Sequence, residues 1–335
     1  MDFKAAESFE GGVILKEVKN FELNHTFDCG QCFRWEKQKN GNYIGTVYGR
    51  VIELEKKDED IIIYNTNMED FNSLWINYFD LNRDYSSIKE ELSKDPLLKE
   101  AVAYGHGIRI LQQDPFEITL SFIISARNSI PIIMRTIKNL SRTYGKPIEY
   151  KGETYYAFPE IEELRGLEVT DYEACGASFR SKYLKDTVEK ISNAEDIIKD
   201  MEQEKSHFIM DPEALEEVLK YDLNRIKELN DEECHTALQN FSGIGPKVAD
   251  CIALFSMKKY SSFPVDVWVK RAMQFFYLAP DVSLPKIRIF GRNKFGELSG
   301  FAQQYLFYYA RENNINIDDE PLVNNLSETS NPLEF

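Results

Sequence analysis

A lysine and an aspartate that could act as a catalytic pair lie close together in the sequence. Lys247 directly follows the glycine-containing segment 241–246, and Asp266 lies 19 residues further on, within Phe-Pro-Val-Asp-Val. A neutral lysine amine is a carbon nucleophile, and a carboxylate stabilises positive charge that develops beside it. Free lysine is almost wholly protonated at neutral pH, so a nucleophilic lysine requires burial or neighbouring cations. The two residues form a candidate active site, although Asp266 also suits the simple role of a helix cap.

The segment 241–246, Phe-Ser-Gly-Ile-Gly-Pro, predicts a short hairpin between two helices. Gly243 and Gly245 are free to take positive φ, and Pro246 suits the first position of a helix. Unpaired amides at a helix N-terminus, together with the helix dipole, favour the binding of a phosphate. We therefore expect this hairpin to hold a nucleic-acid backbone. Taken alone, it is more typical of a DNA-binding protein without catalytic activity.

The order Gly-Ile-Gly-Pro-Lys-Val-Ala-Asp-Cys, followed by Phe-Pro-Val-Asp-Val, resembles the 8-oxoguanine DNA glycosylase/lyase family of the helix-hairpin-helix (HhH-GPD) superfamily. The resemblance covers about residues 10–312 and is strongest in 238–272 and 296–310. It implies that Lys247 attacks C1′ of a flipped nucleotide in duplex DNA, expels 8-oxoguanine and then cleaves the strand by β-elimination. It also implies that Asp266 stabilises the charge on the sugar and helps to orient or deprotonate the lysine.

The same resemblance implies a slot for the damaged base. Cys251 lies one helical turn after Lys247 on the same helix face, and Gln303 and Phe307 are also separated by four residues. The family pattern places Cys251 and Phe307 on the two ring faces and Gln303 on the Watson–Crick edge. Gln304 and Tyr305 are alternatives for the edge that the spacing leaves open.

A further base contact is implied near the N-terminus, within Cys-Gly-Gln-Cys-Phe-Arg-Trp at 29–35. There the carbonyl of Gly30 would accept a hydrogen bond from N7–H, a proton that 8-oxoguanine has and guanine lacks. A strand glycine is otherwise a bulge or a close packing point, and Cys29 with Cys32 has the spacing of a redox pair or half a zinc site. Pro264, two residues before Asp266, is assigned to the same base pocket.

The remaining expected contacts are with the DNA strands. They lie in the polar loop 125–129, in an aromatic-basic pair that would wedge at the opposite strand, and around the hairpin. They are Arg127, Asn128, Phe179, Arg180, Gly243, Gly245, Val248 and Trp268. The loop also fits a solvated helix corner, and Phe179 also fits a core. Arg127 departs from the family pattern of a polar residue, often Asn, and Trp268 stands where relatives often place a His near the phosphate. Ile132 and Ile133 lie where some relatives have an arginine that reads the opposite cytosine, so the resemblance implies weaker selection for cytosine opposite the lesion.

Hydrophobic periodicity predicts an α+β fold. Residues 10–66 alternate apolar and polar side chains, with a turn at 39–42, which predicts an antiparallel sheet, TATA-box-binding-protein-like by the resemblance. An all-α body follows, with helices expected at about 86–104, 115–125, 131–144, 179–203, 211–221, 231–240, 246–257, 264–278 and 298–312. We expect an N-terminal sheet domain with flanking helices at 1–105, a helical part at 106–315 containing the hairpin region 238–250, and a disordered acidic tail at 316–335.

The charge and the cysteine content limit which partners and cofactors this chain can have. The net charge of −16 argues at first against nucleic acid, but residues 241–311 hold ten Lys/Arg against four Asp/Glu, whereas 312–335 hold six acids and no base. Five scattered cysteines fit a reducing compartment and predict neither an iron–sulfur cluster nor another cofactor. No apolar run approaches a membrane span. We expect a monomer acting on damaged double-stranded DNA, nucleoid-associated in a bacterial cytoplasm or nuclear in a eukaryote, and not secreted.

Three functions compete on this evidence. The first is excision of 8-oxoguanine, the second excision of an alkylated purine or oxidised pyrimidine, and the third DNA binding without catalysis. Lys247 and Asp266 oppose the third, whereas Gly30, Gln303 and Phe307 favour the first over the second.

Overall fold

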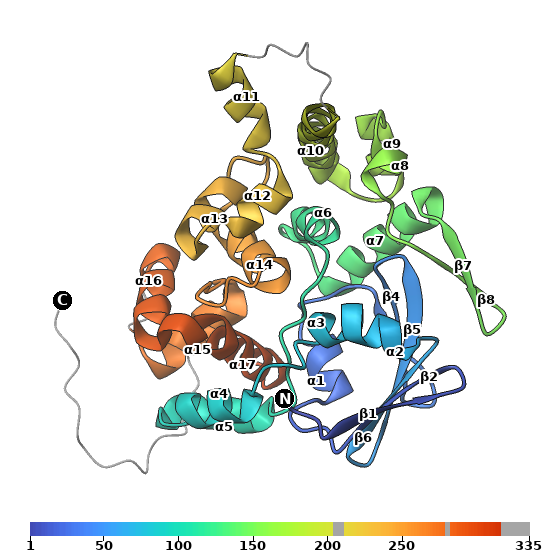
Figure 1. The fold of residues 1–335 in the computed structure, drawn as a ribbon. Helices are drawn as coiled ribbons and strands as arrows, with labels where there is room; N and C mark the ends of the chain where they lie inside the picture. The colour runs from blue at the N-terminus through green and yellow to red at the C-terminus, as the bar shows by residue number, and fades with distance from the viewer. Residues whose placement is uncertain (204–210, 279–281, 316–335) are drawn as a thin grey trace.

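The computed structural model describes residues 1–203, 211–278 and 282–315, which form an N-terminal sheet and a larger helical body (Figure 1). The sheet is antiparallel, with strand order β1-β2-β6-β5-β4-β3. Its strands are β1 Ala5–Phe9, β2 Gly12–Lys16, β3 Trp35–Lys37, β4 Tyr43–Val47, β5 Arg50–Lys57 and β6 Asp60–Tyr64. Alternate residues such as Val13, Leu15, Ile61 and Ile63 are fully buried on one face. The predicted α+β fold, a sheet followed by a helical body, is confirmed.

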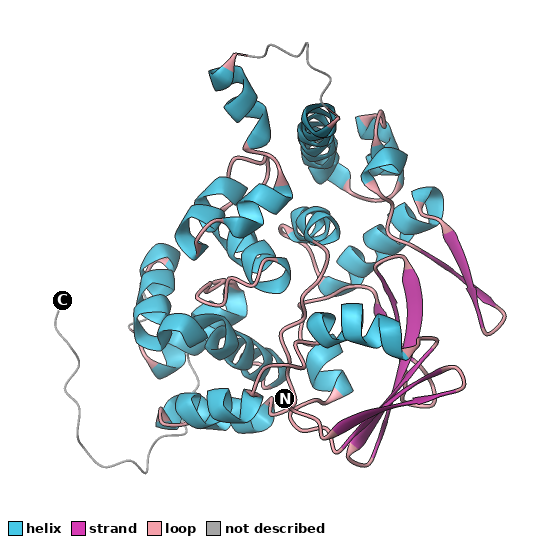
Figure 2. Ribbon diagram, in the orientation of Figure 1, coloured by secondary structure: helices cyan, strands magenta, loops and turns pink. Residues whose placement is uncertain are grey.

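The helices lie mainly after the sheet, and Figure 2 shows the strands confined to one side of the molecule. The helices that precede the hairpin are α1 Leu23–Phe27, α2 Met68–Asp70, α3 Ile76–Tyr78, α4 Tyr85–Leu92, α5 Pro96–Tyr104, α6 Pro115–Ser125, α7 Ile130–Tyr144, α8 Ile161–Leu164, α9 Val169–Ala174, α10 Ser181–Glu202, α11 Pro212–Leu219, α12 Leu223–Glu228 and α13 Asp231–Leu238. Those that follow it are α14 Pro246–Ser256, α15 Val267–Phe276, α16 Leu284–Phe295 and α17 Ser299–Glu312. A small hairpin of β7 Pro147–Tyr150 and β8 Glu153–Tyr156 follows α7.

The single helix expected at 86–104 is wrong, because the chain forms two helices there. The Asp95 side chain accepts hydrogen bonds from the amides of Leu97 and Leu98, and Pro96 begins α5. Proline cannot donate to a preceding turn, so a helix cannot run through this position undisturbed. By contrast, α6 begins at the expected position, and the Asp114 side chain caps it by accepting a hydrogen bond from Glu117 N.

Several short elements were not predicted. Helix α1 occupies a segment read as strand, and β7–β8, α8, α9, α12 and α16 fall between the expected helices. Contacts with the rest of the protein set the position of the shorter ones, since segments of four to six residues carry little periodic signal of their own. α16 is longer, and its start at Leu284 with Pro285 in the first turn follows the usual helix-start pattern.

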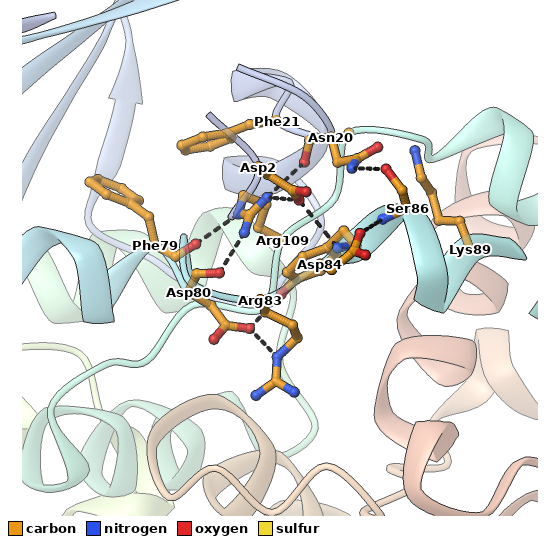
Figure 3. Close-up of polar contacts among 12 residues, drawn as sticks. Asp2, Asn20, Phe21, Phe79, Asp80, Arg83, Asp84, Ser86, Lys89 and Arg109 are labelled. Atoms are coloured by element: carbon orange, nitrogen blue, oxygen red, sulfur yellow. Dashed lines mark hydrogen bonds and ion pairs between the residues drawn. The ribbon is translucent and has the colours of Figure 1, made fainter. Parts of the chain in front are cut away.

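A buried arginine joins the sheet to the helical body (Figure 3). Arg109 is fully buried; its Nε donates to the carbonyl of Phe79 at 2.8 Å, and its Nη1 donates to Asp2 Oδ2, also at 2.8 Å. Its Nη2 donates to the carbonyl of Asp80, whose side chain in turn pairs with Arg83. Removing one partner from such a buried set leaves an uncompensated charge, so the set stabilises the contact between the N-terminus, the end of α3 and the segment that leads into α6.

Two hydrophobic cores follow this arrangement, one beneath the sheet and one in the helical body, and the second includes apolar residues of α4 and α5. The division at residue 105 stays a prediction. No helix in the described ranges is long and apolar enough to cross a membrane. The predicted disordered tail, 316–335, lies outside the described residues.

Candidate active site

The predicted hairpin joins α13 to α14 and presents the start of α14. Gly243 takes φ +84°, and a Cβ there would lie 2.7 Å from the ring of Tyr183, so both backbone conformation and space require glycine. Gly245 is the N-cap residue of α14 with an extended backbone, so only Gly243 uses positive φ. Because Gly245 has no side chain to cap the first turn, the first amides of α14 are available to an external anion.

Lys247 lies in that first turn, half-buried between helices α6 and α14. Its Nζ lies 5.4 Å from the centroid of the Phe122 ring, which is buried on α6. Burial raises the pKa of the Cys251 thiol to about 11, and the nearby Lys247 ammonium partly opposes this rise. The amine and the thiol therefore face the same space, as their spacing predicted.

Asp266 caps α15 and also faces Lys247. Its Oδ1 accepts hydrogen bonds from the amides of Trp268 at 2.9 Å and Val269 at 2.8 Å. Burial raises the pKa of this carboxyl, while the Val269 amide, Lys247, the Trp268 amide and Arg311 act in the opposite direction. The two amides occupy one carboxylate oxygen, so the cap and a second role at the other oxygen are compatible.

The base-slot residues meet where the N-terminal segment docks on α17. Gly30 takes φ +78°, and a Cβ there would lie 3.2 Å from Cε1 of Phe307. The guanidinium carbon of Arg311 lies 5.2 Å from the Phe307 ring centroid, and Arg311 donates to the carbonyl of Asp28. At Gly30 the backbone therefore approaches the Phe307 ring closely, and a larger residue would strain the backbone and crowd the ring.

The structure separates the two glutamines that the spacing left open. Gln304 Nε2 donates to the carbonyl of Cys29 at 2.7 Å, so this side chain supports the Gly30 segment. Gln303 is 4% exposed, and its Oε1 has no hydrogen-bond partner among the described residues. A buried orphan acceptor costs free energy unless a ligand pairs with it. This favours Gln303 over Gln304 as the reader of a base edge.

The Cys29–Cys32 spacing does not make a redox or zinc site. Both thiols donate to backbone carbonyls, Cys29 Sγ to Thr26 and Cys32 Sγ to Phe27. Burial raises the pKa of Cys29 to about 11 and that of Cys32 well above its ordinary value, so both stay protonated. All five cysteines are free and buried, and the described ranges contain no group of three or more His, Cys, Asp or Glu suited to a metal ion.

The DNA-facing candidates divide into exposed and buried side chains. Arg127 is exposed with φ +52°, and the ring of Phe179 is 49% exposed. Arg180 is only 5% exposed; its Nε donates to the carbonyl of Ala126 at 2.8 Å and its Nη2 to that of Arg127 at 3.1 Å. Its guanidinium carbon lies 4.3 Å from the Phe179 ring centroid. Arg180 therefore holds the loop 125–129 and Phe179 together, which favours a supporting role over a direct DNA contact.

The other predicted residues are placed as follows. Asn128 Nδ2 donates to the carbonyl of Ile124 at 3.2 Å, within the loop. Val248 is buried behind the hairpin, Pro264 is buried before Asp266, and Trp268 is half-buried with Arg271 4.9 Å from its ring centroid. Of the pair in α7 that departs from the family pattern, Ile132 is 40% exposed and Ile133 is buried.

Three residues near this site were missed from the sequence. Phe122 supplies the ring beside Lys247, and Arg311 contacts both Phe307 and the Asp28 carbonyl. Gln31 is fully buried: its Nε2 donates to the carbonyls of Thr26 and Arg109, and its Oε1 accepts from Leu111 N. The only available signal for Gln31 was its place between two cysteines, next to the candidate Gly30.

Comparison with known proteins agrees with this geometry. Residues 13–119 match the model of the 8-oxoguanine DNA glycosylase N-terminal domain, and residues 120–306 match that of HhH-GPD superfamily base excision DNA repair proteins. The 8-oxoguanine glycosylase/lyase of Clostridium acetobutylicum, solved with double-stranded DNA containing cytosine opposite 8-oxoG, is 57% identical with a TM-score of 0.85, over 94% of this chain and all of that chain. The structure of MBOgg1 is 42% identical with a TM-score of 0.84, over 94% of this chain and all of that chain. The N-glycosylase/DNA lyase OGG1 of Arabidopsis thaliana is 28% identical over 84% of this chain and 75% of its own length. Taken with the Gly30–Phe307 contact and the Lys247–Asp266 pair, these matches show that the chain belongs to the 8-oxoguanine DNA glycosylase/lyase family of the HhH-GPD superfamily.

Proposed function

We propose that this enzyme excises 8-oxoguanine from duplex DNA and then cleaves the strand at the resulting abasic site. The observation that carries the proposal is the placement of the Lys247 amine at the start of α14, against Phe122 and facing Cys251 and Asp266. A DNA-binding hairpin without catalysis needs no amine facing a buried carboxyl. The likeness to glycosylase/lyase structures solved with DNA supports the same reaction.

The base must leave the helical stack before any protein group can reach C1′. The amides of the hairpin and of the first turn of α14 hold the backbone without reading sequence. The exposed ring of Phe179 enters the duplex near the vacated position, and the loop with Arg127 and Asn128 lies beside it. Trp268 and Val248 flank the phosphate site.

The flipped base lies between Cys251 and Phe307. Gln303 pairs with its Watson–Crick edge, and the Gly30 carbonyl accepts the hydrogen bond from N7–H. Pro264 closes the pocket near Asp266. Guanine has a lone pair instead of a proton at N7, so it would face the carbonyl with unfavourable electrostatics. This arrangement favours 8-oxoguanine over alkylated purines and oxidised pyrimidines.

The chemistry follows from the amine and the carboxyl. Once the Lys247 ammonium has lost a proton, its neutral amine forms a bond to C1′ while the bond from C1′ to the base breaks. The departing base takes the electron pair, and the proton lost by the new C1′–nitrogen ammonium neutralises it. Asp266 stabilises the positive charge on the sugar, and its raised pKa suits it to take a proton from the lysine. The sugar opens to an imine, after which loss of a C2′ proton expels the 3′ phosphate by β-elimination.

Borohydride trapping tests the nucleophile directly, since it reduces the imine to a stable adduct. Wild-type protein should become covalently attached to a duplex that carries one 8-oxoguanine. Lys247→Gln should abolish trapping, because an amide forms no imine, and should keep duplex binding, because the hairpin amides remain. Trapping of the variant at the wild-type level would refute the assignment.

A panel of duplexes, each with a single lesion, tests the substrate. Fastest excision of 8-oxoguanine is expected, and faster excision of an alkylated base would replace this proposal with the alternative. We further propose that the enzyme acts as a monomer on damaged double-stranded DNA. Nucleoid association in a bacterial cytoplasm, or a nuclear location in a eukaryote, follows from that substrate.

A further inference from the structure

A buried polar cluster lies behind the hairpin, outside the base slot. Asp250 of α14 is fully buried; its Oδ2 accepts from Nε of Arg288 at 2.7 Å and its Oδ1 from Nη2 at 3.0 Å. His235 of α13 is 6% exposed, and its Nε2 lies 3.6 Å from Asp250 Oδ1. Since Arg288 belongs to α16, the cluster joins three helices next to the first turn of α14.

The protonation of His235 follows from its partners. Nε2 lies 3.2 Å from the carbonyl oxygen of Pro246, which can only accept, so Nε2 carries a proton. Nδ1 lies 3.2 Å from Gln239 Nε2, which can only donate, so Nδ1 is bare. Gln239 Nε2 also donates to the His235 carbonyl at 3.0 Å, which fixes the direction of the amide. The two partners therefore select the neutral Nε2–H tautomer.

The neutral form of the His235 imidazole also agrees with the charged groups around it. Burial lowers the pKa of His235, and Arg288 adds to this effect, while Asp250, the Pro246 carbonyl and Glu232 oppose it without reversing it. The carboxylate of Asp250 is already satisfied by two hydrogen bonds from Arg288, and Arg288 also lies 3.7 Å from Glu232. Arg292 also pairs with Glu232, so two arginines balance the two carboxylates and the cluster needs no imidazolium for charge balance.

We propose that His235 is a positioning residue for the Lys247 nucleophile, acting through its hydrogen bond to the Pro246 carbonyl. That carbonyl belongs to the peptide bond that joins Pro246 to Lys247. Because no side chain caps α14 at Gly245, the bond from His235 restrains the first turn from behind. The inference rests on the proposed role of Lys247, since a small rotation of this turn displaces the amine from C1′.

The test compares three variants on a duplex with a preformed abasic site, where base recognition plays no part. His235→Ala removes the hydrogen bond, His235→Gln keeps a donor of similar reach, and His106→Ala removes an exposed imidazole elsewhere as the matched control. The measurements are the single-turnover rate of borohydride trapping and the Kd for the duplex. Thermal unfolding shows whether each variant is folded at the assay temperature.

His235→Ala should trap about tenfold more slowly than wild type with Kd changed less than about twofold. His235→Gln should regain most of the rate, and His106→Ala should match wild type. An unchanged rate in His235→Ala, no recovery in His235→Gln, or a rise in Kd that accounts for the lost rate would each overturn the proposal. If wild-type protein itself gives no adduct, the role of Lys247 fails instead, which separates the two failures.

The tautomer gives a second test that does not depend on a folded His235→Ala protein. Nitrogen-15 shifts of the free wild-type enzyme at neutral pH should show a protonated Nε2 and a bare Nδ1 at His235. Gln239→Met removes the donor to Nδ1, so it should admit the other tautomer and slow trapping in part. A protonated Nδ1 in wild type, or wild-type trapping by Gln239→Met with an altered tautomer, would contradict the proposal.

Discussion

The nucleophile side and the recognition side of this site are built in opposite ways. Lys247, Cys251 and Asp266 lie within 20 residues of one another on adjacent helices. The base slot instead requires Gly30 to meet Phe307, and the supporting bond from Gln304 to the Cys29 carbonyl spans 275 positions. On the proposed assignments, the chemistry relies on local structure, whereas the choice of base relies on how the N-terminal segment docks on α17. Substitutions on the two sides should separate strand cleavage from base excision.

The largest effect is expected from Asp266→Asn, on the nucleophile side. Asn still caps α15 through its side-chain oxygen, so the fold should persist. The loss of charge stabilisation should lower excision by about 100- to 1,000-fold, and strand cleavage should fall with it. Single-turnover kinetics measure the rate of excision, and thermal unfolding shows whether the fold persists. Excision within a few-fold of wild type would reduce Asp266 to a helix cap.

Gly30→Ala should break the recognition side alone. The added Cβ would lie 3.2 Å from the Phe307 ring and would force φ +78° on an alanine, so the slot should deform. Excision of 8-oxoguanine should fall on the order of 100-fold, whereas cleavage of a preformed abasic site should change little. Gly41→Ala, in an open turn with φ +92°, carries the same backbone strain far from the slot and is the control. Equal losses on both substrates would show that the Gly30 segment supports Lys247 as well.

Gln303→Ala should have a smaller effect of the same kind. The loss of an edge contact should raise the barrier to excision by about 1–3 kcal/mol, with abasic-site cleavage unaffected. Gln304→Leu is the matched comparison, since it loses the bond to Cys29 and should lower the free energy of unfolding as well. If Gln303→Ala impaired both reactions equally, the residue would support the fold or the lysine, and the edge-reading role would move to Gln304.

The smallest expected effect concerns Glu117, buried beside Arg34 of the N-terminal segment. Burial raises its pKa to about 7, with Arg34 opposing the rise and Asp114 adding to it. Between pH of about 4.5 and 7 the folded state keeps a proton that the unfolded state has lost, so the free energy of unfolding falls as pH rises through this window. Glu117→Gln should remove this slope and stabilise the protein above pH 7 by on the order of 1 kcal/mol. Unfolding in denaturant at several pH values measures how the free energy of unfolding depends on pH. The same pH dependence in wild type and variant would contradict the raised pKa of Glu117.

The contrast between local and long-range contacts also explains which features could be predicted from the sequence. The hairpin, Lys247 and Asp266 form one continuous pattern, so their elements and spacing could be predicted, as could the sheet from its alternation. The break at Pro96 was visible in the sequence but was outweighed by helical periodicity on both sides. The roles that Arg180, Gln304 and Gln31 take depend on carbonyl groups far along the chain, which no local pattern encodes. No sequence pattern singles out His235, because its partners are Pro246 and Asp250 of α14 and Gln239 at the C-terminal end of its own helix.

The bond between Gln304 and the Cys29 carbonyl also orders events during synthesis. The Gly30 segment leaves the ribosome early, but the surface that completes it, on α17, is among the last described parts of the chain to emerge. Until α17 has been made, Gly30 lacks the Phe307 ring on which it packs, and the Cys29 carbonyl lacks the amide donor of Gln304. A nascent chain that ends before α17 would contain the hairpin and the lysine but not the surface on which the Gly30 segment packs, so the proposed base slot can form only after α17 has been made.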